Sequence, residues 1–158
     1  AFSHDVMMKQ KPRILEKEWL DIFIRLRTEI GRCPHCGQET FYTFRGSHDI
    51  PCMECSKKIS ITNALQIKNQ ILPIFPDLKI SLWTVDSSLE DIRTQVAEVV
   101  KNPKDPRLLG LRNLSQRTWS INLPDGSQRP LPPQQVVPVR VGFEIHFLGG
   151  TNDSGIIK

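Results

Sequence analysis

The sequence predicts a mainly β protein with an N-terminal helix, and three patterns lead to that fold class. Apolar residues recur at helical spacing near the start, two pairs of cysteines follow, and beyond residue 71 short strand-like runs alternate with turn residues. The chain has 158 residues, of which 39% are hydrophobic and 24% charged, as is typical of a globular protein. This length allows one ordinary domain, or a modest domain beside a very small unit that something other than its core stabilises.

The first expected element is a helix between Lys11 and Ile30, within an N-terminal unit at residues 1–31. Its apolar residues recur at steps of three and four, which places them on one face. Pro12 suits the first turn, where its missing N–H has no partner, and Gly31 suits the position after the last turn. The apolar face implies packing, either on the domain that follows or on a part upstream of Ala1, and the pattern leaves both open. The apolar positions are Leu15, Trp19, Ile22, Phe23, Leu26 and Ile30.

Two cysteine pairs follow this helix, Cys33 with Cys36 and Cys52 with Cys55. A C-x-x-C turn points two sulfurs inward, and two such turns at this separation match the ligand spacing of zinc sites. Gly37 directly after the first pair tolerates a positive φ, whereas the matching residue after the second pair is a less suitable serine. We therefore expect one structural Zn²⁺ held by four thiolates, with no open coordination position.

The cysteines define a zinc ribbon at residues 32–62, with a short β-type stretch from Thr40 to Arg45. Two disulfides are the alternative, but C-x-x-C pairs usually mark metal or redox chemistry and a cytosolic chain keeps structural thiols reduced. A redox role would need one pair in a βαβ setting, which the sequence does not predict. His35 and His48 are near enough to be substitute ligands, although with four thiolates we expect them at the surface or beside the ligands. Metal binding would supply the folding free energy that so short a segment lacks.

The presumed ribbon hairpin carries aromatic residues among cations, and two interpretations remain open. Such a surface could stack bases and hold phosphates. Alternatively, the aromatics cover the metal and the neighbouring helix, and the cations lower the charge of the metal–thiolate cluster, which is the interpretation we favour. The formal charge of +4 would fall to about +2 with four thiolates on Zn²⁺, which is weak support for a polyanion partner. The residues are Phe41, Tyr42, Phe44, Arg32, Arg45, Lys57 and Lys58.

A β-sandwich is expected at residues 72–158, after a linker or short helix at residues 63–71. Strand-like runs occur about every 8–12 residues, separated by turn signals such as Asp125-Gly126. In the first run Leu78, Ile80 and Leu82 alternate with polar residues. The candidate strands are 78–85, 96–101, 108–114, 118–123, 136–141 and 143–148.

Several segments resemble one protein family. Lys11-Pro12 with Glu18-Trp19-Leu20 looks like the closing helix of a protein-kinase C-lobe. The Cys-Pro-His-Cys-Gly ribbon and the later motifs are similar to the C-terminal region of bacterial eukaryotic-like Ser/Thr kinases, which accompany phosphatases and von Willebrand-type proteins in tellurite-resistance-associated systems. Those later motifs are Asp105-Pro106-Arg107, residues 110–115, Trp119, Pro124-Asp125-Gly126 and residues 142–147.

The β part resembles a forkhead-associated (FHA) sandwich, a fold that in many relatives binds phosphothreonine peptides. Residues 115–118 stand where that family tends to have Ser-x-Asn-Gly-Thr, so Arg117 replaces the peptide-contacting Asn. Independently of the resemblance, Arg112, Asn113, Ser115 and Arg117 place two cations beside hydroxyl and amide groups, which suits phosphate recognition. Turn capping by Asn and Ser beside solvated arginines is the alternative.

The sequence therefore predicts a non-catalytic regulatory or protein-interaction module of a bacterial Ser/Thr kinase, and a nucleic-acid-binding zinc ribbon is the alternative. Neither a Gly-rich phosphate loop nor a kinase catalytic signature is present in the sequence. The expected partners are proteins: the kinase domain, a phosphatase or a von Willebrand-type protein, in a phosphorylated or unphosphorylated form. No run of transmembrane length and no signal peptide is present, so a membrane is not expected as a partner and a cytoplasmic location is the default.

Overall fold

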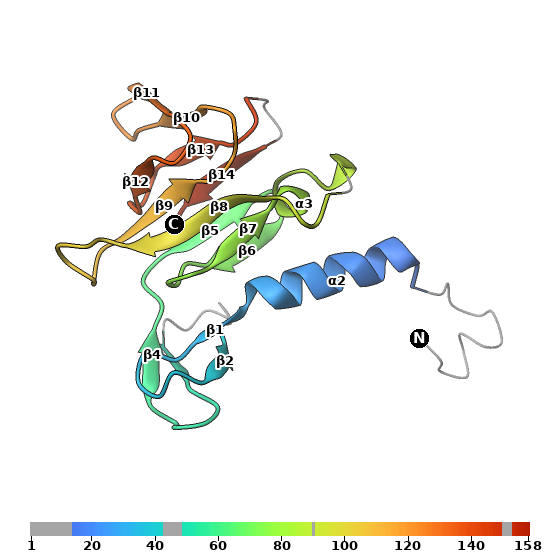
Figure 1. Ribbon diagram of the computed structural model, residues 1–158, viewed down its shortest axis with the longest axis vertical. Coiled ribbons are helices and arrows are strands. Elements are labelled where there is room, and N and C mark those ends of the chain that lie inside the picture. The colour runs from blue at the N-terminus through green and yellow to red at the C-terminus, as the bar shows by residue number, and fades with distance from the viewer. Residues whose placement is uncertain (1–13, 43–48, 90, 150–152) are drawn as a thin grey trace.

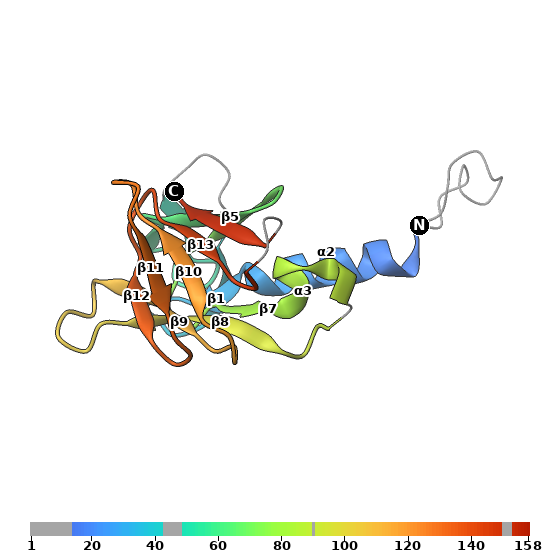
Figure 2. The same cartoon turned by 90° about the horizontal axis from the view of Figure 1, so that it is seen from above.

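The computed structural model describes residues 14–42, 49–89, 91–149 and 153–158, and it confirms a mainly β chain with an N-terminal helix (Figure 1). Helix α2 (Glu16–Thr28) leads into a small unit that holds the cysteines, and this unit leads into a β-sandwich. Figure 2 shows the sandwich at one end and α2 extending away from it. Within the described residues no helix has both the length and the apolar character needed to cross a bilayer.

α2 has complementary charges at its two ends. The N–H of Leu15 donates to the Glu18 carboxylate at 2.6 Å, which satisfies one of the free donors of the first turn. Acidic residues stand in the first turn and the basic residues Arg25 and Arg27 in the last, as the helix dipole favours. The expected start at Lys11 and Pro12 lies outside the described residues.

The apolar face of α2 does not cover the sandwich, which removes one of the two alternatives for its packing. Leu15 and Phe23 remain 67% and 59% exposed, whereas Thr28 on the other side of the helix is buried. The amphipathic pattern therefore predicted the helix but not the direction in which its apolar face points.

The ribbon consists of two short antiparallel hairpins, each closed by one cysteine pair. In the first, β1 (Ile30–Arg32) pairs with β2 (Glu39–Phe41), and in the second, β3 (Asp49–Pro51) pairs with β4 (Lys58–Ser60). The expected stretch from Thr40 to Arg45 is thus a strand at its start, and residues 43–48, including Phe44, Arg45 and His48, lie outside the described residues.

The sandwich has two facing sheets. One has the strand order β11-β10-β13-β14-β5-β6 and the other β12-β9-β8-β7. The strands of the first are β5 (Ala64–Ile67), β6 (Gln70–Pro73), β10 (Trp119–Asn122), β11 (Gln128–Leu131), β13 (Glu144–His146) and β14 (Ser154–Ile157). Those of the second are β7 (Lys79–Ser81), β8 (Gln95–Lys101), β9 (Leu109–Asn113) and β12 (Val136–Pro138). The short helices α3 (Leu82–Val85) and η1 (Ser87–Leu89) follow β7.

Each expected strand overlaps an observed one, but β5, β6, β11 and β14 were not expected as strands, and one expected strand is divided. Residues 63–71, expected as a linker or short helix, form β5 and the start of β6, because Leu65 and Ile67 are buried in the core while Gln66 is half-buried. The run 78–85 divides at Ser81, whose hydroxyl accepts a bond from the N–H of Thr84 at 3.4 Å and so caps α3.

The ribbon and the sandwich share one hydrophobic core. Trp119 and Phe147 meet edge to face between the sheets, with ring centroids 4.9 Å apart. The same cluster of buried side chains extends to Ile59, Ile61 and Cys33 of the ribbon. The ribbon is therefore packed onto the sandwich rather than joined to it only through the chain.

Candidate metal centre and the loops beside it

The first cysteine turn is held by its own backbone. The N–H of Cys33 donates to the carbonyl of Gln38 at 2.8 Å, and the N–H of Gly37 donates back to the carbonyl of Cys33 at 2.9 Å. Gly37 has a φ of +75°, as the turn requires. The N–H of His35 donates to the Cys33 sulfur at 3.4 Å.

The second turn repeats the first almost bond for bond. Cys52 donates to the carbonyl of Lys57 at 2.9 Å, and Ser56 donates back to the carbonyl of Cys52 at 3.0 Å. The N–H of Glu54 lies 3.4 Å from the Cys52 sulfur. Ser56 has a φ of +57°, a conformation that a residue with a Cβ rarely adopts. The two halves of the ribbon are therefore structural equivalents, although their sequences outside the cysteines differ.

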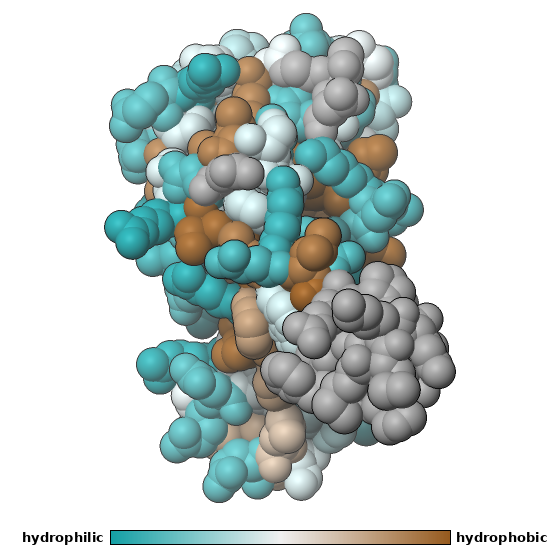
Figure 3. All heavy atoms as spheres, turned by 90° about the vertical axis from the view of Figure 1, so that its right-hand side faces the viewer, coloured by the Kyte–Doolittle hydropathy of each residue, from teal (hydrophilic) through white to brown (hydrophobic). Residues whose placement is uncertain are grey.

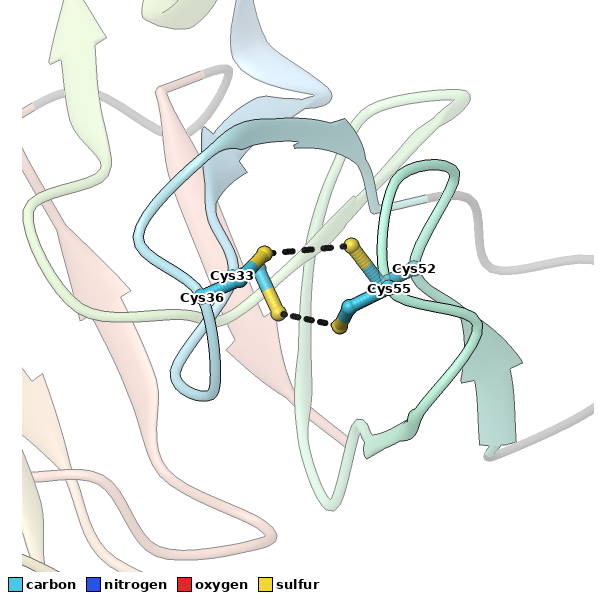
Figure 4. Close-up of side chains that lie close together, drawn as sticks. All are labelled: Cys33, Cys36, Cys52 and Cys55. Carbon is cyan, nitrogen blue, oxygen red and sulfur yellow. Dashed lines mark hydrogen bonds between the residues drawn. The ribbon is translucent and has the colours of Figure 1, made fainter.

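The four sulfurs form one cluster with the size of a tetrahedral metal site (Figure 4). The sulfurs of Cys33 and Cys55 are 3.8 Å apart, those of Cys36 and Cys52 are 3.7 Å apart, and all four lie within 4.8 Å of one another. Metal–sulfur bonds of about 2.3 Å in a tetrahedron would place the sulfurs roughly 3.8 Å apart. All four cysteines are free thiols, so the group could bind one metal ion.

The electrostatics of the cluster favour a cation at its centre. The backbone N–H groups of Cys55 and Glu54 lower the pKa of Cys52 to about 6. At Cys36 the N–H of Gln38 lowers the pKa, but desolvation and the three neighbouring thiols outweigh it and raise the pKa to about 12. A divalent cation among the sulfurs would favour the thiolate, which is the form that binds metal.

Polar contacts around the cluster join the two hairpins. A ring nitrogen of His35, Nε2, lies 3.0 Å from the carbonyl of Lys58. The N–H of Met53 donates to the hydroxyl of buried Thr40 at 3.3 Å. His35 thus contacts the opposite hairpin instead of acting as a ligand, and His48, the other histidine considered, lies outside the described residues.

Tyr42 connects the ribbon to the sandwich. Its ring is buried and stacks on Phe75 with centroids 4.2 Å apart, and its hydroxyl donates to the carbonyl of Arg32 at 2.8 Å. A Cβ at Gly31 would lie only 2.5 Å from the Phe75 ring, so only glycine allows this approach. The sequence singled out Tyr42 but neither Phe75 nor the contact of Gly31, because their proximity depends on the tertiary fold.

The four residues considered for phosphate recognition do not form one site. Arg112 lies on β9, with its guanidinium 3.4 Å from the Glu98 carboxylate. Asn113 is fully buried: its amide donates to the carbonyls of Arg117 and Leu131, and its oxygen accepts from the N–H and hydroxyl of Ser115. Asn113 therefore shapes the loop, as the turn-capping alternative requires.

Ser115 and Arg117 do lie together, at the rim of a cavity of about 690 Å³. The Ser115 hydroxyl accepts a bond from the Trp119 indole at 3.1 Å, and an Arg117 guanidinium nitrogen lies 3.3 Å from the carbonyl of Leu148. The cavity also has the apolar side chains of Leu82, Leu89 and Leu114 and the carboxylate of Asp86. Sequence patterns did not indicate Leu82, Leu89 and Asp86 as site residues, because they come from the segment of the short helices α3 and η1 after β7.

Comparison with known proteins adds no relative: the chain matches no family model, no curated protein and no solved structure.

Proposed function

We propose that this chain is a non-catalytic protein-interaction module whose metal centre is a structural zinc site. The observation that carries the proposal is the cluster of four cysteine sulfurs within 4.8 Å. Four thiolates complete a tetrahedral zinc site, so no position is left for water or substrate. The metal then stabilises the two hairpins, whose strands of three residues are too short to fold without it.

The identity of the metal is tested by elemental analysis. Four thiolates also hold iron, so the purified protein is analysed for both metals and examined for the visible absorption of iron–thiolate sites. We expect one equivalent of zinc and a colourless protein. Iron at one equivalent would contradict the zinc assignment, and purified protein with a folded ribbon and no metal would contradict the metal site itself.

The docking surface of the module is the cavity beside Ser115 and Arg117. Its apolar lining can bury side chains of a peptide, and its polar lining offers a cation at Arg117 and carboxylates at Asp86 and Asp153. The Ser115 hydroxyl is already engaged within the loop, so recognition of a phosphate group would depend mainly on Arg117.

Calorimetric titration tests whether the module binds a phosphorylated partner more tightly than an unphosphorylated one. The probes are a degenerate peptide mixture with a fixed phosphothreonine and the same mixture with threonine. If phosphate is recognised, Arg117→Gln should weaken binding of the first mixture by about tenfold or more. Arg112→Gln is the matched control, because Arg112 lies on β9 and pairs with Glu98. Equal effects of the two variants would contradict a role for the cavity.

The resemblance to kinase C-terminal regions supports a Ser/Thr kinase domain, a phosphatase or a von Willebrand-type protein as the partner. If the zinc-loaded chain binds none of these, the kinase context of the proposal fails, while the zinc site and the cavity remain testable by themselves. The nucleic-acid alternative is less well supported, since Tyr42 is buried against Phe75 and is not free to stack on a base.

A further inference from the structure

Helix α2 carries an apolar stripe that is exposed in the described structure, although Ile22 at its edge also lines a pocket with Lys68 and Trp83 of the sandwich. Leu15 is 67% exposed, Phe23 59% and Ile22 47%, and Trp19 and Leu26 are exposed as well. These residues recur on one side of the helix at steps of three or four. Figures 1 and 2 show that the N-terminal end of α2 extends past the sandwich. In Figure 3, which faces that side of the molecule, hydrophobic groups reach the surface among hydrophilic ones.

Polar contacts on the opposite side of α2 set this orientation. The indole N–H of Trp83 donates to the carboxylate of Asp21 at 2.6 Å, and the ammonium group of Lys17 lies 5.5 Å from the centre of the same indole. Thr28, on the same side as Asp21, is buried. A rotation that turned the apolar stripe toward the sandwich would break the contacts with Trp83, so the stripe is available to another molecule.

The spacing of the stripe is that of a helix-pairing seam. Leu15, Trp19, Ile22 and Leu26 follow one another at steps of four, three and four, the repeat of the core positions in a coiled coil. Phe23 flanks the seam and stacks on Trp19, with ring centroids 5.8 Å apart. The surface therefore suits another helix better than an extended peptide or a small ligand.

The charges of α2 favour a second copy of the same helix in the antiparallel direction. Glu16 and Glu18 occupy its first turn, and Arg25 and Arg27 its last turn. Two antiparallel copies place the acidic turn of each against the basic turn of the other, whereas parallel copies would align like charges. In the seam register, Glu18 and Arg25 are the flanking residues that meet, and the twofold axis makes this pair occur twice.

We propose that α2 is a self-association surface, on which a second copy of this chain docks antiparallel through Leu15, Trp19, Ile22 and Leu26. The proposal is independent of the docking function of the sandwich cavity. A helix of 13 residues is about 20 Å long, so the seam is smaller than a standard protein interface. We therefore expect a reversible dimer with a dissociation constant of the order of micromolar.

Sedimentation equilibrium of the metal-loaded protein, from low micromolar to millimolar concentration, tests the proposal. The wild-type chain should pass from monomer to dimer. Ile22→Glu, near the twofold axis, should weaken the dimer roughly a hundredfold or more, because it buries two like charges in the seam. Leu108→Glu is the matched control, since Leu108 is 55% exposed on the hairpin between β8 and β9. A chain that is monomeric at all concentrations, or a dimer that Ile22→Glu leaves intact, would overturn the proposal.

Charge exchange tests the antiparallel register. Arg25→Glu should weaken the dimer several-fold, because it opposes Glu18 of the second copy, and adding Glu18→Arg should restore most of the affinity. Circular dichroism of each variant checks that α2 still forms, because Glu18 also accepts the N–H of Leu15. If the double variant dimerises no more tightly than Arg25→Glu alone, while α2 remains helical in both, the antiparallel pairing is wrong. Binding of α2 to a different protein by a chain that never self-associates would likewise overturn the proposal.

Discussion

Gly37 and Ser56 occupy equivalent positions in the two cysteine turns, but only glycine adopts the required conformation without strain. Gly37 and Ser56 both have positive φ, +75° and +57°, and each donates its N–H to the carbonyl of the first cysteine of its pair. A side chain in this conformation costs about 1–2 kcal/mol, because its Cβ crowds the neighbouring carbonyl oxygen. The second half of the ribbon therefore carries local strain that the first half avoids.

Substitutions at these two positions should change stability in opposite directions. Ser56→Gly removes the strain but also frees the unfolded chain, so we expect a gain of up to about 1 kcal/mol. Gly37→Ser should lose about 1–2 kcal/mol through its conformation alone, since nothing lies within 4 Å of a Cβ placed there. Scanning calorimetry of the metal-loaded variants measures both effects, and shifts of the same sign would contradict the equivalence of the two turns.

Tyr42 allows a direct spectroscopic test, because it is the single tyrosine of the chain. Burial, together with the negative charges of Cys33 and Cys52, raises its pKa from 10.0 to about 12. An unfolded chain ionises its tyrosine from about pH 10, so the contribution of Tyr42 to stability is complete below pH 10 and is lost as pH rises toward 12. Ultraviolet titration should show tyrosinate near pH 12 in the native protein and near pH 10 in denaturant. The same value in both states would contradict the buried position of the ring.

At the scale of the elements, the sequence was most informative where short-range patterns decide the structure. The cysteine spacing correctly indicated two turns that meet, and Asp125-Gly126 correctly indicated the turn between β10 and β11, with Gly126 at a φ of +82°. The spacing of strand-like runs between turn residues likewise located β8 and β9. These features depend on residues close to one another in the chain.

Long-range contacts explain what the sequence did not reveal. α2 was predicted, but its orientation depends on Trp83, which is 62 residues from Asp21 in the chain. Strand β5 was missed because the stretch from Asn63 to Gln70 is polar at many positions, and its pairing with β14 joins it to the far end of the chain. The cavity beside Arg117 was missed for the same reason: its other wall comes from the turns after β7.

The contact between the ribbon and the sandwich leads to a prediction about Gly31 and Phe75. Gly31→Ala would place a methyl group 2.5 Å from the Phe75 ring, and we expect a loss of about 1–3 kcal/mol from overpacking. Phe75→Leu in the same chain removes the obstructing ring edge and should recover part of that loss. Chemical denaturation of the two single variants and the double variant gives the coupling energy. Additive losses would show that the ring does not constrain residue 31.

At the scale of the whole molecule, the ribbon depends on the sandwich more than the sandwich depends on the ribbon. The ribbon contributes short hairpins and a few core side chains, such as Ile59 and Tyr42, to the shared cluster. Most of the shared cluster lies in the sandwich, where Trp119 and Phe147 meet edge to face. Loss of the metal should therefore have a graded effect along the chain rather than unfold all of it.

Metal removal tests this asymmetry. A chelator, or the Cys36→Ser variant, leaves the remaining thiols without the cation that compensates their charge, so we expect β1 to β4 to lose amide protection in hydrogen exchange. Strands β8 to β10 should stay protected. The contact of Trp83 with Asp21 should loosen, because α2 leads directly into β1 and loses its anchor.

Met53→Ser is the control, since Met53 lies between the cysteines of the second pair, is 72% exposed, and should leave metal binding unchanged. If the sandwich loses protection together with the ribbon, the chain is one cooperative unit that requires its metal; if β1 to β4 stay protected without metal, the packing of Tyr42 on Phe75 alone holds the ribbon.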